Sequence, residues 1–279
     1  DAARARLTAG SQVIETPHGL IEYAVKGSGP TVLVIHGAGG GYDQGLLLSR
    51  AFGGDNFQWI APSRFGYLRT PLPPNASTAA QADALADLLD TLGVQRVSIV
   101  AHSGGVPPAL QFALRHPERT SALVLMAGAP YTPLTAAEQK TPVPVWVYQA
   151  LFSSDFPYWV LQKVARPNLE AIFDVSPALR ASLTTEESGM VSDMVDAFEP
   201  VTWRIAGVRN EGAAIAPDAR NPIEKITVPT LVVHAQDDAI NPVRYSEYTA
   251  EHIPGAEFLR LPDGGHLLLE AGVEHLGGL

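Results

Sequence analysis

The chain of 279 residues is long enough to bury one large core, or one core and a subdomain, and its 46% hydrophobic content excludes a disordered protein. A formal net charge of −10 argues against nucleic-acid or anionic-membrane partners, because both require a basic patch. With 0 cysteines, the sequence excludes disulfides, thiolate metal ligands and a cysteine nucleophile.

Eight segments have the apolar, β-branched character of strands. They span residues 12–15, 20–25, 31–35, 57–61, 97–101, 121–127, 230–236 and 256–261. From the third onward, several are continuous apolar runs of the kind that a parallel sheet buries on both faces. Helical segments alternate with them, which predicts an α/β fold with a doubly wound, mostly parallel eight-stranded sheet flanked by helices.

The clearest helical pattern lies between the fourth and fifth strands. This helix is expected to begin at Thr78, with Gln81 completing a capping box, and to stop at Gly93. Its leucines fall on one face, which is typical of a helix packed against a sheet. They are Leu85, Leu88, Leu89 and Leu92.

A long interval between Ala127 and Thr230 breaks the alternation of strands and helices. Helices are expected from Thr141, from Asp155, from Thr184 and from Pro200 to about Arg209. Thr184 forms a capping box with Glu187. We interpret the interval as a helical cap inserted over the sheet, which divides the chain into a first core part at 1–130, a cap at 131–225 and a second core part at 226–279.

The predicted cap is rich in tryptophan, with Trp146, Trp159 and Trp203. Each ring is either part of the core of the cap or part of the surface that it presents to a ligand. Since a cap over a site must present some surface to substrate, we expect Trp146 and Trp159 to contribute to a binding pocket.

The stretch V-A-H-S-G-G-V-P-P at residues 100–108 joins an apolar strand to an apolar helix. A serine between small residues at such a junction is typical of a nucleophile elbow, a strained turn that raises the hydroxyl above the sheet. Ser103 is therefore the first candidate nucleophile. Pro107 and Pro108 fall in the first helical turn, where missing N–H groups cost little.

Three further segments place candidate groups at strand ends, where an open parallel sheet assembles its site. Asp237 and Asp238 follow the strand at 230–236, and His266 lies in a glycine-rich loop after the last strand. The loop at 36–41, H-G-A-G-G-G, carries few side chains that could obstruct its backbone N–H groups. The order serine, aspartate, histidine is that of a known class of hydrolases.

With these motifs the chain resembles the α/β-hydrolase family over nearly its whole length. The resemblance implies that Ser103 is the nucleophile, His266 the general base and then acid, and Asp238 the residue that orients the imidazole. The backbone N–H groups of Ala38 and Gly104 are implied as the oxyanion hole, and Gly39 and His102 as substrate neighbours. Asp238 is preferred to Asp237 by the spacing of the family's H-G-x-x-D-x-x-x-P pattern, which reads H-A-Q-D-D-A-I-N-P here.

Several residues near these motifs also have plainer interpretations. His36, His102 and His234 are expected mainly to pack against or brace their own loops. Asp263 is a weak rival for the triad acid, because it lies in the loop of the histidine itself. Arg64 is expected either to pair with Asp43 and steady the oxyanion loop or to lie solvated at the surface.

The resemblance implies a cofactor-independent serine hydrolase, most simply a carboxylesterase that cleaves short to medium apolar esters through an acyl-enzyme. An amidase similar to proline iminopeptidases is an alternative, with Glu186, Glu187 or Glu199 as amine-binding groups. A lactonase, a carbon–carbon bond hydrolase and a non-catalytic ligand receptor also remain open, because the fold supports many reactions.

We expect no metal or other cofactor, since no His, Asp and Glu cluster has metal-ligand spacing. The expected partner is a small-molecule ester, with no nucleic acid and no membrane segment in this chain. The sequence begins at Asp1, so a removed signal or anchor would make the protein periplasmic or extracytoplasmic rather than cytoplasmic. Oligomeric state is left open.

Overall fold

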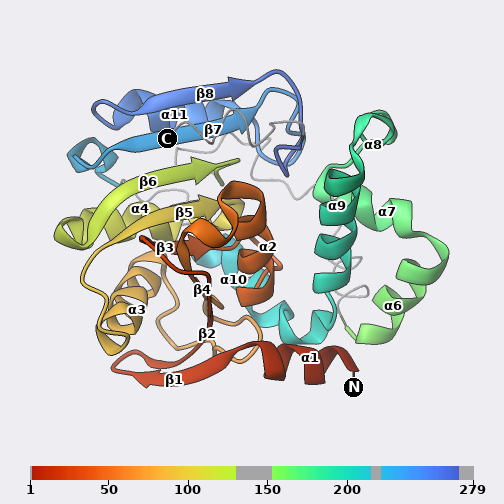
Figure 1. Ribbon diagram of the computed structural model, residues 1–279, viewed down its shortest axis with the longest axis horizontal. Helices are drawn as coiled ribbons and strands as arrows, with labels where there is room; N and C mark the ends of the chain where they lie inside the picture. Colours follow the sequence, from red (N-terminus) through yellow and green to blue (C-terminus); the bar gives the residue numbers. More distant parts are fainter. Residues whose placement is uncertain (1, 130–152, 215–220, 270–279) are drawn as a thin grey trace.

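The computed structural model describes residues 2–129, 153–214 and 221–269. Within these ranges one eight-stranded sheet has the order β1-β2-β4-β3-β5-β6-β7-β8 (Figure 1). The β1–β2 and β2–β4 pairs are antiparallel and the remaining pairs are parallel. The strands are β1 Gln12–Thr16, β2 Gly19–Lys26, β3 Thr31–Ile35, β4 Gln58–Pro62, β5 Val97–His102, β6 Thr120–Met126, β7 Thr230–Ala235 and β8 Glu257–Leu261. The eight predicted strands and the mostly parallel sheet are confirmed.

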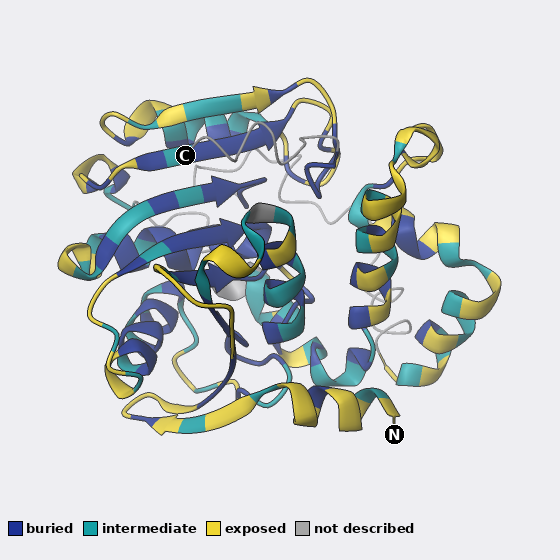
Figure 2. Cartoon of the chain, in the orientation of Figure 1, coloured by how far each residue is buried: buried dark blue, intermediate teal, exposed yellow. Residues whose placement is uncertain are grey.

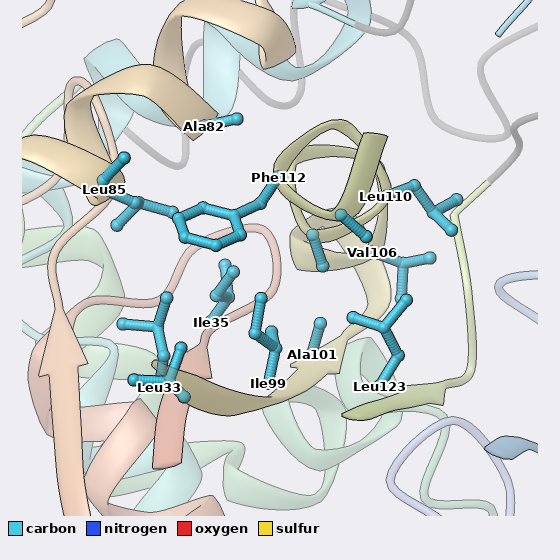
Figure 3. Close-up of a cluster of buried hydrophobic side chains, with 14 of the residues drawn as sticks. Leu33, Ile35, Ala82, Leu85, Ile99, Ala101, Val106, Leu110, Phe112 and Leu123 are labelled. Atoms are coloured by element: carbon cyan, nitrogen blue, oxygen red, sulfur yellow. The ribbon is translucent and has the colours of Figure 1, made fainter. Parts of the chain in front are cut away.

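The central strands bury both faces because alternate side chains enter two separate apolar clusters. In β5, Ile99 and Ala101 pack into one cluster while Val100 packs into the other. Figure 3 shows the first cluster, in which Phe112 lies over the strand residues. Figure 2 shows the middle strands dark blue and β1 largely yellow, which agrees with the exposed pattern of this edge strand.

Helices cover both faces of the sheet. Residues of α3 Thr78–Thr91, α4 Val106–Arg115 and α11 Arg244–His252 pack into or against the cluster of Figure 3. On the opposite face, α2 Tyr42–Phe52 and α1 Ala2–Gly10 contribute Leu48 and Leu7 to the second cluster. Burying a leucine of this kind stabilises the fold by about 1.5–3 kcal/mol relative to exposure.

The start of α3 differs from the sequence prediction. Ser77 is the N-cap, and its hydroxyl accepts the Ala80 N–H, so the predicted capping box of Thr78 and Gln81 is wrong. Both Ser77 and Thr78 are suitable caps, and a one-residue shift moves Gln81 beyond the capping position. The Gln81 side chain is buried instead, and its oxygen accepts from Arg64 Nε at 3.2 Å.

The region between β6 and β7 contains a group of helices, which we call the insert. Its described helices are α6 Asp155–Val164, α7 Arg166–Glu170, α8 Pro177–Ser182, α9 Thr185–Ala197 and α10 Ile205–Ala214. In Figure 1, α6 to α9 lie beyond the arrowheads of the parallel strands, at their carboxyl ends. The helix expected from Thr141 lies outside the described residues.

The insert agrees with the sequence prediction in part. The helix from Asp155 and the capping box of Thr184 with Glu187 are present. The single helix expected from Pro200 is instead a 3-10 turn at Val201–Trp203, followed by α10. Arg204 separates the two elements, because its guanidinium turns inward and donates to the Phe198 and Ala197 carbonyls.

Apolar side chains and buried charge both attach the insert to the core. Val191 and Met194 of α9 belong to the same cluster as Leu48 of α2. Arg204, with 0% exposure, donates to the Gly40 carbonyl at 2.7 Å and pairs with Asp43 at 2.7 Å. A buried charge is costly unless it is fully paired, so these bonds define one seating of the insert on the loop after β3.

Candidate active site at the carboxyl ends of the strands

The turn after β5 has the geometry expected of a nucleophile elbow. Ser103 has a φ of 53°, although it is not a glycine, and α4 begins directly after Gly105. A left-handed conformation costs such a residue about 1–2 kcal/mol. Glycine is required beside it, because a Cβ on Gly105 would lie 2.4 Å from the Ile35 carbonyl oxygen. The turn therefore requires glycine at position 105, because a larger residue would collide with the backbone of β3.

Tertiary folding brings Ser103, His266 and Asp238 into one hydrogen-bonded chain. His266 Nε2 lies 2.9 Å from Ser103 Oγ, and His266 Nδ1 lies 2.9 Å from Asp238 Oδ2. The three residues follow β5, β8 and β7, so their loops meet at one edge of the sheet. All three side chains are buried, with exposures of 8% or less for the residues. A hydroxyl, an imidazole and a carboxylate in this order can activate the hydroxyl as a nucleophile.

The neighbouring carboxylates have different positions. Asp238 Oδ1 accepts the N–H groups of Ile240 and Asn241, each at 2.9 Å, which fixes the carboxylate beneath the imidazole. Asp237 points to the other loop and accepts the Gly265 N–H at 2.9 Å. Asp263 is exposed. The structure thus places Asp238 at the imidazole, as the spacing of the motif indicated.

His234 and His102, which we expected to pack against or brace their loops, contact the residues of this chain. His234 Nε2 lies 3.1 Å from Asp238 Oδ2. Burial by itself raises the pKa of the Asp238 carboxyl, but the hydrogen bonds from His234 and His266 lower it by more. The pKa of Asp238 is therefore held well below its ordinary range. His102 Nε2 donates to the His266 carbonyl at 2.8 Å. Burial, and then the neighbouring His266, lower the pKa of His102 to about 3, so its ring stays neutral.

The loop at 36–41 lies directly over the elbow. A Cβ on Gly37 would be 3.0 Å from Ser103 Cβ, and a Cβ on Gly104 would be 3.2 Å from the Ala38 nitrogen. The backbone N–H groups of Ala38 and Gly104 thus come from segments in close contact beside Ser103. Gly39 is placed differently, because its N–H donates to the Tyr67 hydroxyl at 3.3 Å and its φ is 73°.

A cluster of charged and polar side chains supports this loop, and sequence analysis missed most of it. Arg64 does not pair with Asp43; its guanidinium binds Glu211 of α10 at 2.8 Å and the His36 carbonyl at 3.2 Å. Tyr67 donates to the same Glu211 carboxylate at 2.5 Å. Asp43 is instead the partner of Arg204 in the insert. Only the fold pairs these residues, since Arg64 and Glu211 are 147 positions apart.

Glu211 is an acidic side chain of the insert that lies beside the elbow. Its Oε2 lies 3.0 Å from the position that a Cβ on Gly104 would take. Of the three glutamates weighed from the sequence, Glu187 completes the cap of α9, Glu186 is exposed, and burial raises the pKa of Glu199. The sequence of α10 has no clear amphipathic pattern, so nothing in the neighbouring residues indicates that Glu211 faces the core.

Of the two tryptophans expected in a binding pocket, only Trp159 lies within the described residues. Trp159 lies on α6, 45% exposed, and its ring stacks on Phe156 with centroids 6.1 Å apart. Trp146 lies outside the described residues. Their contact with substrate stays a prediction.

The described ranges also bear on metals and membranes. Within them, no group of three or more His, Asp or Glu side chains is placed to hold a metal ion. None of the helices in these ranges combines the length and apolarity needed to span a bilayer.

The fold and the serine-centred site define a hydrolase-type α/β protein. A family model described as the alpha/beta hydrolase fold matches residues 30–273, and the chain belongs to this family.

Bacterial proteins similar to this chain include named hydrolases. An uncharacterized hydrolase, YcgS, of Bacillus subtilis is 26% identical, with 90% of this chain and 89% of the relative covered. A 2-hydroxymuconate semialdehyde hydrolase of Pseudomonas putida is 27% identical over 86% of this chain and 82% of its own. The solved structure of an alpha/beta hydrolase fold protein from Nakamurella multipartita has a TM-score of 0.74 and 28% identity, with 92% of each chain covered. These similarities support a hydrolase.

The buried neutral histidines predict how stability depends on pH. Burial lowers the pKa of both His102 and His36 from 6.5. Below pH 6.5 these two histidines bind protons in the unfolded chain but stay unprotonated in the folded protein. The free energy of unfolding therefore decreases as the pH falls below 6.5. Each ring contributes a slope of about 1.4 kcal/mol per pH unit.

We expect His102→Gln, which keeps an N–H donor for the His266 carbonyl, to reduce this slope by about 1.4 kcal/mol per pH unit. The measurement is urea unfolding at several values between about pH 7 and about pH 4.5. Equal slopes for the wild type and the variant contradict a neutral buried ring.

Proposed function

We propose that this protein is a serine carboxylesterase that works through an acyl-enzyme on Ser103, without a cofactor. The observation that carries the proposal is the unbroken chain from Asp238 through His266 to Ser103, with 2.9 Å at both links. Ser103 itself is held at positive φ, which is a second feature of activated serines. Membership of the hydrolase family supports the same reaction class.

In the proposed mechanism His266 Nε2 accepts the Ser103 proton as Oγ attacks the acyl carbon. Asp238 keeps the proton on His266 Nδ1 and stabilises the imidazolium that forms. The backbone N–H groups of Ala38 and Gly104 donate to the developing oxyanion, and each such donor is worth about 3 kcal/mol. His266 then protonates the leaving alcohol and activates the water that releases the acid.

The preference for uncharged substrates rests on the electrostatics around Glu211. Its Oε2 lies 3.0 Å from the position that a Cβ on Gly104 would take, but the buried Arg64 guanidinium pairs with this carboxylate and Tyr67 donates to it. An ammonium group of a substrate would have to compete with this buried partner, which is costly. The arrangement therefore favours an ester over an aminoacyl amide.

A hydrolase of carbon–carbon bonds is the second candidate. The observation in its favour is the relative named 2-hydroxymuconate semialdehyde hydrolase. A semialdehyde of this kind contains neither an ester nor an amide bond, so its hydrolysis requires cleavage between carbons. A screen of esters, lactones, amides and ring-fission semialdehydes with the purified protein separates the two candidates.

The division of the chain follows the same proposal. We take residues 131–225 as the cap and residues 1–130 and 226–279 as the two parts of the catalytic core. Helices α6 to α9 of the insert lie at the carboxyl ends of the parallel strands, on the side where a cap over Ser103 is expected. Trp146 and Trp159 are the candidates in this cap for contact with an apolar acyl group.

Replacement of Ser103 tests the nucleophile. Ser103→Ala is expected to lower kcat by about 10⁴-fold or more, because triad members act as a unit. A fluorophosphonate probe should label the wild type at Ser103 and leave the variant unlabelled. Ser98→Ala, on the same strand, is the matched control and should keep both labelling and activity. Labelling of Ser103→Ala at a different serine rejects the assignment.

The adjacent aspartates provide a second test. Asp238→Asn should lower kcat by about 10³ to 10⁴-fold through the wrong imidazole tautomer. Asp237→Asn should cost less than about tenfold, because its amide oxygen can still accept the Gly265 N–H. Steady-state kinetics on p-nitrophenyl acetate measures both. The reverse ranking would mean that Asp237 is the acid.

The cap predicts the dependence of rate on acyl length. Each added methylene that enters an apolar pocket should raise kcat/KM by up to about fourfold, or about 0.8 kcal/mol, until the pocket is full. We expect p-nitrophenyl esters of short to medium acyl length to react best, with no interfacial activation. Trp146→Ala or Trp159→Ala should shift the best length and preserve turnover of the acetate. A flat profile, or preference for cationic aminoacyl substrates, contradicts the esterase proposal.

A further inference from the structure

The backbone of His266 is held by side chains on both sides. Its carbonyl accepts from His102 Nε2 at 2.8 Å, and its N–H donates to Asp174 Oδ2 at 3.1 Å. The imidazole nitrogens contact Asp238 and Ser103. Of these partners, only Asp174 comes from the insert, from a position 92 residues before His266.

Asp174 joins two loops through one oxygen. Its Oδ2 also accepts the N–H of Ala239, at 2.9 Å, and Ala239 directly follows Asp238. The two loops that carry the acid and the base of the proposed mechanism are therefore both hydrogen-bonded to a single carboxylate oxygen.

The local backbone of Asp174 is shaped for this position. It ends the 3-10 turn Ala171–Phe173 with a φ of 65°, a left-handed conformation that aspartate adopts more readily than most residues. The fit to the base loop is close, because a Cβ on Gly265 would lie 3.0 Å from the Asp174 carbonyl oxygen. Burial raises the pKa of Asp174, and the N–H groups of Ala239 and His266 oppose this shift.

We propose that Asp174 is a positioning residue, which sets the relative placement of Asp238 and His266 when the insert is seated on the core. The inference rests on the proposed function, since it assigns the placement of the acid and base of that mechanism. The insert is then part of the catalytic apparatus as well as a cover. A displacement of about 1 Å in a reacting group can cost about 10²-fold in rate, so loss of this anchor should reduce turnover strongly.

Two of the test substitutions, to glycine and to asparagine, tolerate the left-handed backbone of residue 174. Asp174→Gly removes the acceptor without steric strain at positive φ. Asp174→Asn retains an oxygen that can accept both N–H groups, and asparagine also tolerates this conformation. Asp174→Glu keeps the charge but moves the oxygens outward by one carbon–carbon bond. Asp193→Ala is the matched control, because Asp193 also links the insert to the core, through an exposed pair with Arg50 at 3.7 Å.

We expect Asp174→Gly and Asp174→Glu to lower kcat on p-nitrophenyl acetate by about 10- to 100-fold, with KM changed by less than about threefold. The rate of fluorophosphonate labelling should fall in parallel. Asp174→Asn should stay within about threefold of the wild type, and Asp193→Ala should be unchanged. If Asp174→Gly fails to fold, the comparison of the Glu and Asn variants carries the test.

Three results overturn the inference. They are labelling and kcat of Asp174→Gly or Asp174→Glu within about twofold of the wild type, a loss confined to KM, and an Asn variant as impaired as the Glu variant. Failure of the proposed function is distinguishable, because the wild type itself would then not hydrolyse p-nitrophenyl acetate or would not be labelled at Ser103.

Discussion

The imidazole of His266 is the point at which the separate parts of this protein meet. Its two ring nitrogens contact a serine after β5 and an aspartate after β7, and its own loop follows β8. These contacts require the parallel strands to end at one edge with the register observed. The paired strands and the two apolar clusters that bury them therefore stabilise both the fold and the relative positions of Ser103, Asp238 and His266.

Unfavourable local energies are concentrated at this edge. Ser103 is held in a left-handed conformation, and His36 and His102 are buried with their pKa values lowered. Each feature costs stability, and each persists only because surrounding bonds leave no better arrangement. The buried His102 ring, for example, donates its N–H to the His266 carbonyl. This hydrogen bond holds the loop that carries His266.

The insert is attached by charged side chains at three places around the same edge. Arg204 binds the carbonyls after β3, Glu211 binds Arg64 beneath that loop, and Asp174 binds the N–H groups of the other two loops. Apolar packing alone allows small sliding, whereas a desolvated ion pair or a shared acceptor is costly to leave unpaired. The insert and the loops that carry the candidate catalytic residues are thus connected through a few polar contacts.

The sequence by itself determined the elements and the order of the candidate groups, because both depend on residues close together in the chain. Apolar runs and glycine-rich turns located all eight strands to within a residue, and they placed Ser103, Asp238 and His266 at strand ends. Even local reasoning failed where two neighbouring residues were equally suitable, as with Ser77 and Thr78 at the start of α3. Only the tertiary structure decided the pairs Arg64–Glu211, Asp43–Arg204 and Asp174–His266, which span 147, 161 and 92 positions. An ion pair or a buried hydrogen bond has no periodicity along the chain, so its partner is fixed only when the folded insert meets the loops of the core.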